Sequence, residues 1–311
     1  NYVGHLSSKS LDVWKAKEDG SLRNFGVEYI STPLHYEQAK LSVSRIIPEI
    51  LAIPGIMPEC PRAGIHVHVN VRDMTIPQIW TMACIYWLVE NELVEWCGES
   101  RVGNNFCLRL RDATRTVGSA VGAIRSDYIN PYNRHSFKEF GVNQFKYAAL
   151  NLATVNVLGT LEFRSLDGAL KADRINNWID QVVKFRELAI EFGDPVSFFS
   201  WLDSNLDREK AYEKIFTPYF YKTLDIKKIS SSLYTNASFA LSVAFSCPDW
   251  KEYNQLLYNR VHKRASPYIK LGVNRIVNND EEGDIFEDDI IDNPPPVNVL
   301  WQEDEEEVVQ P

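Results

Sequence analysis

Two histidines that alternate with valines are the residues of this chain best suited to chemistry. The segment Gly64–Asn70 reads Gly-Ile-His-Val-His-Val-Asn, and its apolar and polar residues alternate with the period of a β-strand. His66 and His68 therefore share one face, with Cβ atoms roughly 6 to 7 Å apart, so both rings could contact one polyanionic ligand or metal. The alternative is an edge strand whose solvated face happens to carry two histidines.

Two further segments place charged side chains in strand-like patterns. Glu28 lies between apolar neighbours, and Glu162 and Arg164 share the polar face of the segment 159–165, Gly-Thr-Leu-Glu-Phe-Arg-Ser. Carboxylates with an imidazole can bind Mg²⁺ or Mn²⁺ when a phosphate supplies further oxygens, and an arginine beside them can neutralise a phosphoryl group. The alternatives are that Glu28 is simply solvated and that Glu162 pairs with Arg164.

The elements that must position these residues follow from periodicity and turn signals. A hairpin is predicted around Asp19–Ser21, and a helix over Tyr36–Leu51. Another helix is predicted to start at the cap Thr75 and to run to about Trp96, with Glu90, Glu92 and Glu95 on a solvated face. A third is expected over Ala172–Phe192, and residues 193–271 are expected to form several helices.

Composition limits the class of protein. The chain has 311 residues, 45% of them hydrophobic, which suits a globular protein of about two domains. Its formal charge of −9 argues against a general nucleic-acid binder, and it contains no run of 18 apolar residues that would predict a membrane span. Five cysteines without a CxxC spacing predict reduced thiols in the cytoplasm.

The negative charge is concentrated near the end of the chain. From Asn279 onward there are thirteen of the 42 acidic residues and no Lys or Arg, so the 33 basic residues face 29 acidic ones in residues 1–278. The body is therefore mildly basic. We expect residues 278–311, which also contain three consecutive prolines, to form either a flexible tail or a segment that docks on a protein partner.

Three blocks together resemble the amidoligase family, which belongs to the glutamine synthetase and glutamate-cysteine ligase superfamily of carboxylate-amine ligases. The blocks are Gly26–Pro33, Ala63–Val69 and Gly159–Arg164. Asn151 precedes the last block and a helix follows it, and the resemblance as a whole covers residues 12 to about 192. The resemblance implies an α+β fold, an antiparallel sheet with helices packed on one face. It also implies that ATP phosphorylates a substrate carboxylate and that an amine then displaces phosphate to form an amide.

Carried over position by position, the resemblance implies roles for individual residues. The residues that match ligands of Mg²⁺ or Mn²⁺ are Glu28, His66 and Glu162. The residues expected to contact ATP are His68 and Arg164, to which the basic segment 125–146 adds Arg125 and Arg134 as candidates for gripping an anion. The residues that match catalytic or substrate-side positions are Arg164, Arg101 and Asn151.

The chain departs from the family at its start. Members of the superfamily open with a strand that carries two metal-binding glutamates as Glu-x-Glu, whereas only Asp12, Glu18 and Asp19 precede Glu28 as acidic residues. This strand is either upstream of Asn1 or lost. The first alternative predicts an active ligase, and the second an inactive relative with a structural or assembly role. A hydrolase whose metal is held by His66 and His68 is a third, weaker reading, because no third ligand stands at a recognisable spacing.

We therefore expect three parts: a catalytic domain over residues 1–192 whose first strand is missing or upstream, a mostly helical region over 193–277, and the acidic tail over 278–311. The expected substrates are a small-molecule amine and a carboxylate on a peptide, protein or cell-wall-type molecule. The expected setting is the cytoplasm of a bacterium, or of the host if a phage encodes the chain, without nucleic-acid or membrane partners.

Overall fold

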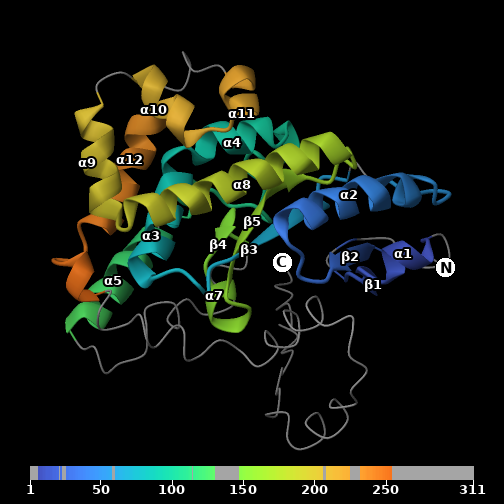
Figure 1. The fold of residues 1–311 in the computed structure, drawn as a ribbon, viewed down its shortest axis with the longest axis horizontal. Helices are drawn as coiled ribbons and strands as arrows, with labels where there is room; N and C mark the ends of the chain where they lie inside the picture. The colour runs from blue at the N-terminus through green and yellow to red at the C-terminus, as the bar shows by residue number, and fades with distance from the viewer. Residues whose placement is uncertain are drawn as a thin grey trace, which may run out of the picture. The chain divides into compact units, whose positions relative to one another are not determined.

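The computed structural model describes residues 6–20, 22, 26–57, 60–113, 115–129, 147–205, 208–224 and 232–253 (Figure 1). They form an α+β fold of small antiparallel sheets and many helices, which confirms the predicted class. All of them belong to a compact unit of residues 1–270. A second unit, residues 271–311, contains the predicted acidic tail and lies outside the described residues.

The elements in chain order are α1 (Ser8–Leu11), β1 (Trp14–Glu18), β2 (Val27–Ser31), α2 (Tyr36–Leu51), β3 (Gly64–Asn70), α3 (Ile76–Leu88), α4 (Glu90–Trp96), the 3₁₀ helices η1 (Glu99–Arg101) and η2 (Leu110–Asp112), α5 (Arg115–Ile129), β4 (Leu150–Asn151), α7 (Thr154–Val157), β5 (Thr160–Asp167), α8 (Ala172–Phe192), α9 (Pro195–Ser204), α10 (Arg208–Ile215), α11 (Pro218–Thr223) and α12 (Ser232–Ala244). The predicted hairpin, the helix over residues 36–51 and the histidine strand are confirmed.

The strands form two separate sheets. β1 pairs with β2 in an antiparallel hairpin, in which Lys17 lies opposite Glu28. The second sheet has the order β3-β5-β4, and both of its pairings are antiparallel. Glu28 therefore lies on a different sheet from the two histidines, although the sequence pattern suggested one shared sheet.

The β3-β5 register gives the second sheet one apolar and one polar face. Val67 lies opposite Phe163 and Val69 opposite Leu161, whereas His68 lies opposite Glu162 and Asn70 opposite Thr160. Because side chains alternate along each strand, the first two pairs point to one side and the last two to the other. The polar residues of β3 and β5 that were singled out in the sequence thus lie on a single face of this sheet.

The apolar face packs against two long helices. Phe163 is fully buried and meets the ring of Tyr86 from α3 edge-to-face, with centroids 5.2 Å apart. Trp178 and Phe185 of α8 contact the same phenyl ring. Helix α8 runs alongside this sheet and also packs on α2 and α3 (Figure 1). Burying these aromatic rings fixes the orientation of β5 and therefore of its polar face.

The described helices after residue 192 share this core. Helix α9 packs on α3 and α8, and α12 packs on α3 and α5. One continuous cluster of buried apolar residues extends from Leu6 to Tyr253. Helices on both sides of residue 192 therefore contribute to the same cluster. No helix in the described part of the chain is both long and apolar enough to cross a lipid bilayer.

The predicted helix over residues 75–96 starts as expected but is interrupted. Thr75 caps α3 in a reciprocal capping box with Gln78. The helix then stops at Val89, and α4 follows. The prediction of a solvated acidic face is wrong for Glu90 and Glu92, which are buried, and only Glu95 is exposed. Every residue of α3 except Gln78 is buried, so its sequence has no polar side from which the orientation of the following acidic residues could be read.

Candidate functional site

Glu162 is the centre of a cluster of polar side chains on the second sheet. Arg164 donates from Nη1 to Glu162 Oε1 over 2.6 Å, and the ring nitrogens His66 Nδ1 and His68 Nε2 lie 3.2 and 3.7 Å from the same oxygen. Asn151 donates from Nδ2 to Glu162 Oε2 over 2.7 Å. The structure thus brings together five of the residues singled out in the sequence.

The strands explain why these side chains meet. The alternation of β3 turns His66 and His68 to the polar face, and the β4-β5 register places Asn151 directly opposite Glu162. A residue without an assigned role also joins the cluster, because Thr160 Oγ1 lies 3.0 Å from His68 Nδ1. Its position on the same polar face as Glu162 was the sequence signal for this contact.

A β-bulge and a buried arginine fix the backbone at Arg164. The β3-β5 register shifts between Ile65 and Val67, which takes a residue out of the regular ladder. At this point Arg101 donates from Nη2 to the carbonyl of Arg164 over 2.7 Å and from Nε to that of Ser165 over 3.2 Å. Arg101 is only 1% exposed. Its guanidinium is therefore placed to hold the strand, whereas the resemblance implied a position on the substrate side.

The charges around Glu162 determine its protonation. Burial alone would raise its pKa, but the hydrogen bond from His66 and the charges of Arg164 and His68 outweigh burial and lower the pKa to about 2. Glu162 is therefore ionised at neutral pH. The pKa of His68 is lowered, chiefly because its ring loses hydration, and the attraction of Glu162 opposes this only in part.

Of the residues that the resemblance implied as metal ligands, His66 and Glu162 lie together on the second sheet, whereas Glu28 lies apart from them on the first. Glu28 is exposed on the β1-β2 hairpin, and among the residues that the structure describes no group of three or more His, Cys, Asp or Glu could hold a metal ion. Both oxygens of Glu162 accept hydrogen bonds from protein groups, one of them the cation of Arg164. A resident divalent ion at Glu162 would have to displace that guanidinium. The metal-binding role of Glu28, His66 and Glu162 stays a prediction.

The site does offer a donor suited to an oxyanion. Among the residues that the structure describes, Arg164 Nε is buried and has no hydrogen-bond partner, while Nη1 of the same guanidinium holds Glu162. A buried donor without a partner costs free energy, so its presence favours a ligand that satisfies it. Arg125 is exposed on α5, a helix that packs on α12, and Arg134 lies outside the described residues.

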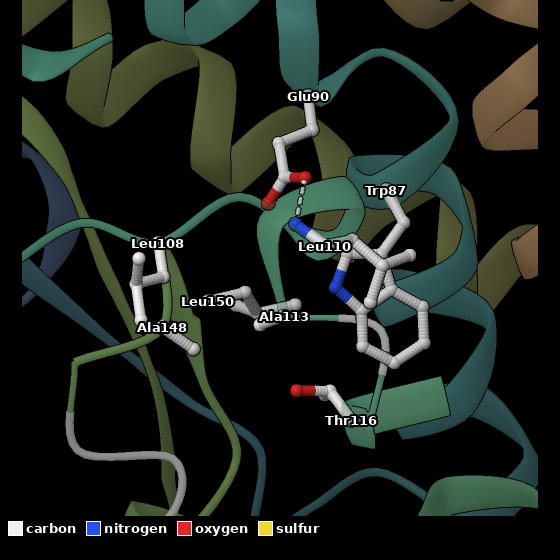
Figure 2. Close-up of a pocket in the computed structure, with 8 residues that line it drawn as sticks. All are labelled: Trp87, Glu90, Leu108, Leu110, Ala113, Thr116, Ala148 and Leu150. Carbon is white, nitrogen blue, oxygen red and sulfur yellow. Dashed lines mark hydrogen bonds between the residues drawn. The ribbon is translucent and has the colours of Figure 1, made fainter. Parts of the chain in front are cut away.

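A separate buried carboxyl lies at the start of α4. Figure 2 shows the carboxylate of Glu90 above a narrow space, with its hydrogen bond to the backbone N–H of Leu110. The residues lining this space are Trp87, Glu90, Leu108, Leu110, Ala113, Thr116, Ala148 and Leu150. The space is too narrow to admit a water molecule. Glu90 accepts from the first N–H of η2 and so caps that helix, which assigns it a structural role.

Comparison with known proteins agrees with the resemblance. No curated protein and no solved structure matches the chain. The family model described as "putative amidoligase enzyme" matches residues 6–185. This range contains β3, β4 and β5 with every side chain of the Glu162 cluster, and it spans more than half of the 311 residues. The chain therefore belongs to the amidoligase family that this model describes.

Proposed function

We propose that the protein is an ATP-dependent carboxylate-amine ligase that forms an amide through an acyl phosphate. Family membership supports a ligase. The observation that supports the ATP-dependent chemistry is the bonding of the Arg164 guanidinium. Its Nη1 binds Glu162, and its buried Nε–H has no hydrogen-bond partner among the described residues. Such a group is a suitable donor to an oxygen of a transferring phosphoryl group.

The reaction has two steps. A carboxylate oxygen of the substrate attacks the γ-phosphorus of ATP, and the bond from that phosphorus to ADP breaks to leave an acyl phosphate. The amine nitrogen then attacks the acyl carbon, the carbon-oxygen bond to phosphate breaks, and the amine loses a proton to water. Arg164 neutralises the phosphoryl oxygens, while Asn151 and Arg101 position Glu162 and the backbone of Arg164.

We propose that Mg²⁺ or Mn²⁺ enters bound to ATP, since Mg²⁺ commonly binds through substrate phosphates together with one or two carboxylates. No step is assigned to the ion. The proposed substrates are a small amine and a carboxylate on a peptide, protein or cell-wall-type molecule, in the cytoplasm of a bacterium or of a phage host.

The test is transfer of oxygen from the carboxylate to phosphate. The full chain is incubated with MgATP, a mixture of amines and ¹⁸O-labelled glutamyl peptides, and the released phosphate is analysed by mass spectrometry. An acyl phosphate requires one ¹⁸O atom in each phosphate that is released. Arg164→Met should lower the rate at least 100-fold, whereas Arg111→Met, at an arginine whose side chain is 49% exposed, should leave it unchanged. Release of unlabelled phosphate alone would contradict the mechanism.

A second candidate is a catalytically inactive relative with a structural or assembly role. Two observations favour it: both carboxylate oxygens of Glu162 already accept hydrogen bonds from the protein, and no group of three or more His, Cys, Asp or Glu among the described residues could hold a metal ion. This candidate predicts that the protein neither binds nor consumes ATP, and a measured affinity for ATP would exclude it.

A further inference from the structure

Arg72 lies in the turn just after β3, the strand that carries His66 and His68. His66, His68 and Asn70 are exposed, while Val69 and Val71 between and after them are buried. The N–H of Val71 still donates to the carbonyl of Gly159, so the pairing with the chain before β5 persists past Asn70. Arg72 comes next, in the turn that follows β3, and therefore lies directly beyond the end of the strand that carries the two histidines.

Gly159 provides the space that Arg72 occupies. A Cβ atom at residue 159 would lie 2.3 Å from Cγ and 2.9 Å from Nε of Arg72. The arginine stem thus lies directly on the backbone just before Thr160, whose hydroxyl contacts His68. Glycine is needed at 159 for this approach as well as for its φ of +67°. The start of the Arg72 guanidinium therefore lies beside Gly159, at the end of the site where β5 begins with Thr160.

The guanidinium of Arg72 lacks a partner within the described chain. Its Nε is buried without a hydrogen-bond partner, and no hydrogen bond or ion pair to its terminal nitrogens is found there. Burial lowers the pKa of Arg72, and the charge of the neighbouring Asp73 opposes this only in part; the ion pair of that carboxylate is with Arg186. A cation that is held against the backbone and partly desolvated without a partner is arranged to bind an anion.

We propose that Arg72 is a second oxyanion-binding residue of the site, which binds a carboxylate or phosphate group of a substrate. This rests on the proposed ligase function only in that the ligand is taken to be a substrate of that reaction. Arg164 stands five residues from Gly159 along β5, roughly 16 Å in an extended strand. The two arginines therefore bind different groups, Arg164 the transferred phosphoryl group and Arg72 a more distant anionic group.

The test is binding of three probes, MgATP, inorganic tripolyphosphate and glutarate, measured by isothermal titration calorimetry. Arg72→Met keeps the apolar stem over Gly159 and removes the charge, Arg72→Gln is the second variant, and Arg111→Met is the control. Both Arg72 variants should lose at least 10-fold in affinity for a probe, while their melting temperatures without ligand stay close to that of the wild type. Weaker binding of the two phosphate probes identifies a phosphate, and weaker binding of glutarate identifies a carboxylate.

Two results would overturn the proposal: unchanged affinities of both Arg72 variants for all three probes, or a wild-type protein that binds none of them. Failure of the ligase function gives a different result. In that case the oxygen transfer is absent, while tripolyphosphate or glutarate still binds and still depends on Arg72.

Discussion

The buried carboxyl of Glu90 makes a quantitative prediction about stability and pH. Burial raises its pKa from an ordinary 4.5 to about 8, and the hydrogen bond from Leu110 and the charge of Arg109 oppose this only in part. Below pH 4.5 the carboxyl is protonated in both the folded and the unfolded chain. Between pH 4.5 and 8 the unfolded chain loses this proton while the folded chain keeps it, so the unfolding free energy falls as pH rises. The difference between these pKa values corresponds to about 5 kcal/mol.

Replacing Glu90 with glutamine isolates this effect. The amide does not titrate, and its oxygen can still accept from the N–H of Leu110. The unfolding free energy of Glu90→Gln should therefore exceed that of the wild type by an amount that grows from near zero at pH 4.5 to about 5 kcal/mol at pH 9.

Urea denaturation, followed by tryptophan fluorescence at pH 5, 7 and 9, measures this difference. Glu95→Gln is the matched control, because Glu95 is exposed on the same helix. Its curve should run parallel to that of the wild type. A Glu90→Gln difference that stays constant with pH would show that Glu90 ionises as an ordinary solvated carboxyl and would refute the reasoning.

Two further predictions concern the supports of the site. Gly159→Ala should lower the unfolding free energy at least 1 kcal/mol more than Gly103→Ala, because both glycines have a positive φ but only Gly159 touches Arg72; equal losses in thermal denaturation would disprove the close contact. Arg101→Met should cost about 3 kcal/mol in urea denaturation, because it strips backbone carbonyls of their donor, whereas Arg111→Met should cost less than about 0.5 kcal/mol. A stable Arg101→Met protein that has lost only activity would instead indicate contact with substrate.

Local patterns predicted most of the elements around the site. The alternation in residues 64–70 placed both histidines on one face, and the cap Thr75 marked the start of α3 correctly. These features depend on neighbours within a few residues, and such neighbours are visible in a sequence. Glu162 and Arg164 also share a face as predicted, and they pair with each other as the simpler alternative proposed.

The errors come from interactions between distant parts of the chain. Nothing near Glu28 shows that β2 pairs only with β1 and stays apart from the second sheet. The burial of Glu90 depends on the packing of residues 108–116 against α3, about twenty residues away. The contacts of Arg101 could not be read from the sequence either, because the carbonyls that accept from it belong to Ala63, 38 residues earlier, and to Arg164 and Ser165, more than sixty residues later. Propensity and period contain no information about such contacts.

The bulge has a consequence for how β5 tolerates changes in length. Before it, the odd-numbered Leu161 and Phe163 point into the core, whereas after it Leu166 pairs with Ile65 and is fully buried. The side chains of β5 that face the core therefore change once from odd-numbered to even-numbered residues. A deletion of one residue at Ser165 would remove the bulge and restore a regular ladder, in which Leu166 would still lie opposite Ile65 and face the core. A one-residue deletion on either side of the bulge would instead turn the side chains beyond it to the opposite face, so the bulge is the place at which β5 can lose a single residue and keep its pattern of burial.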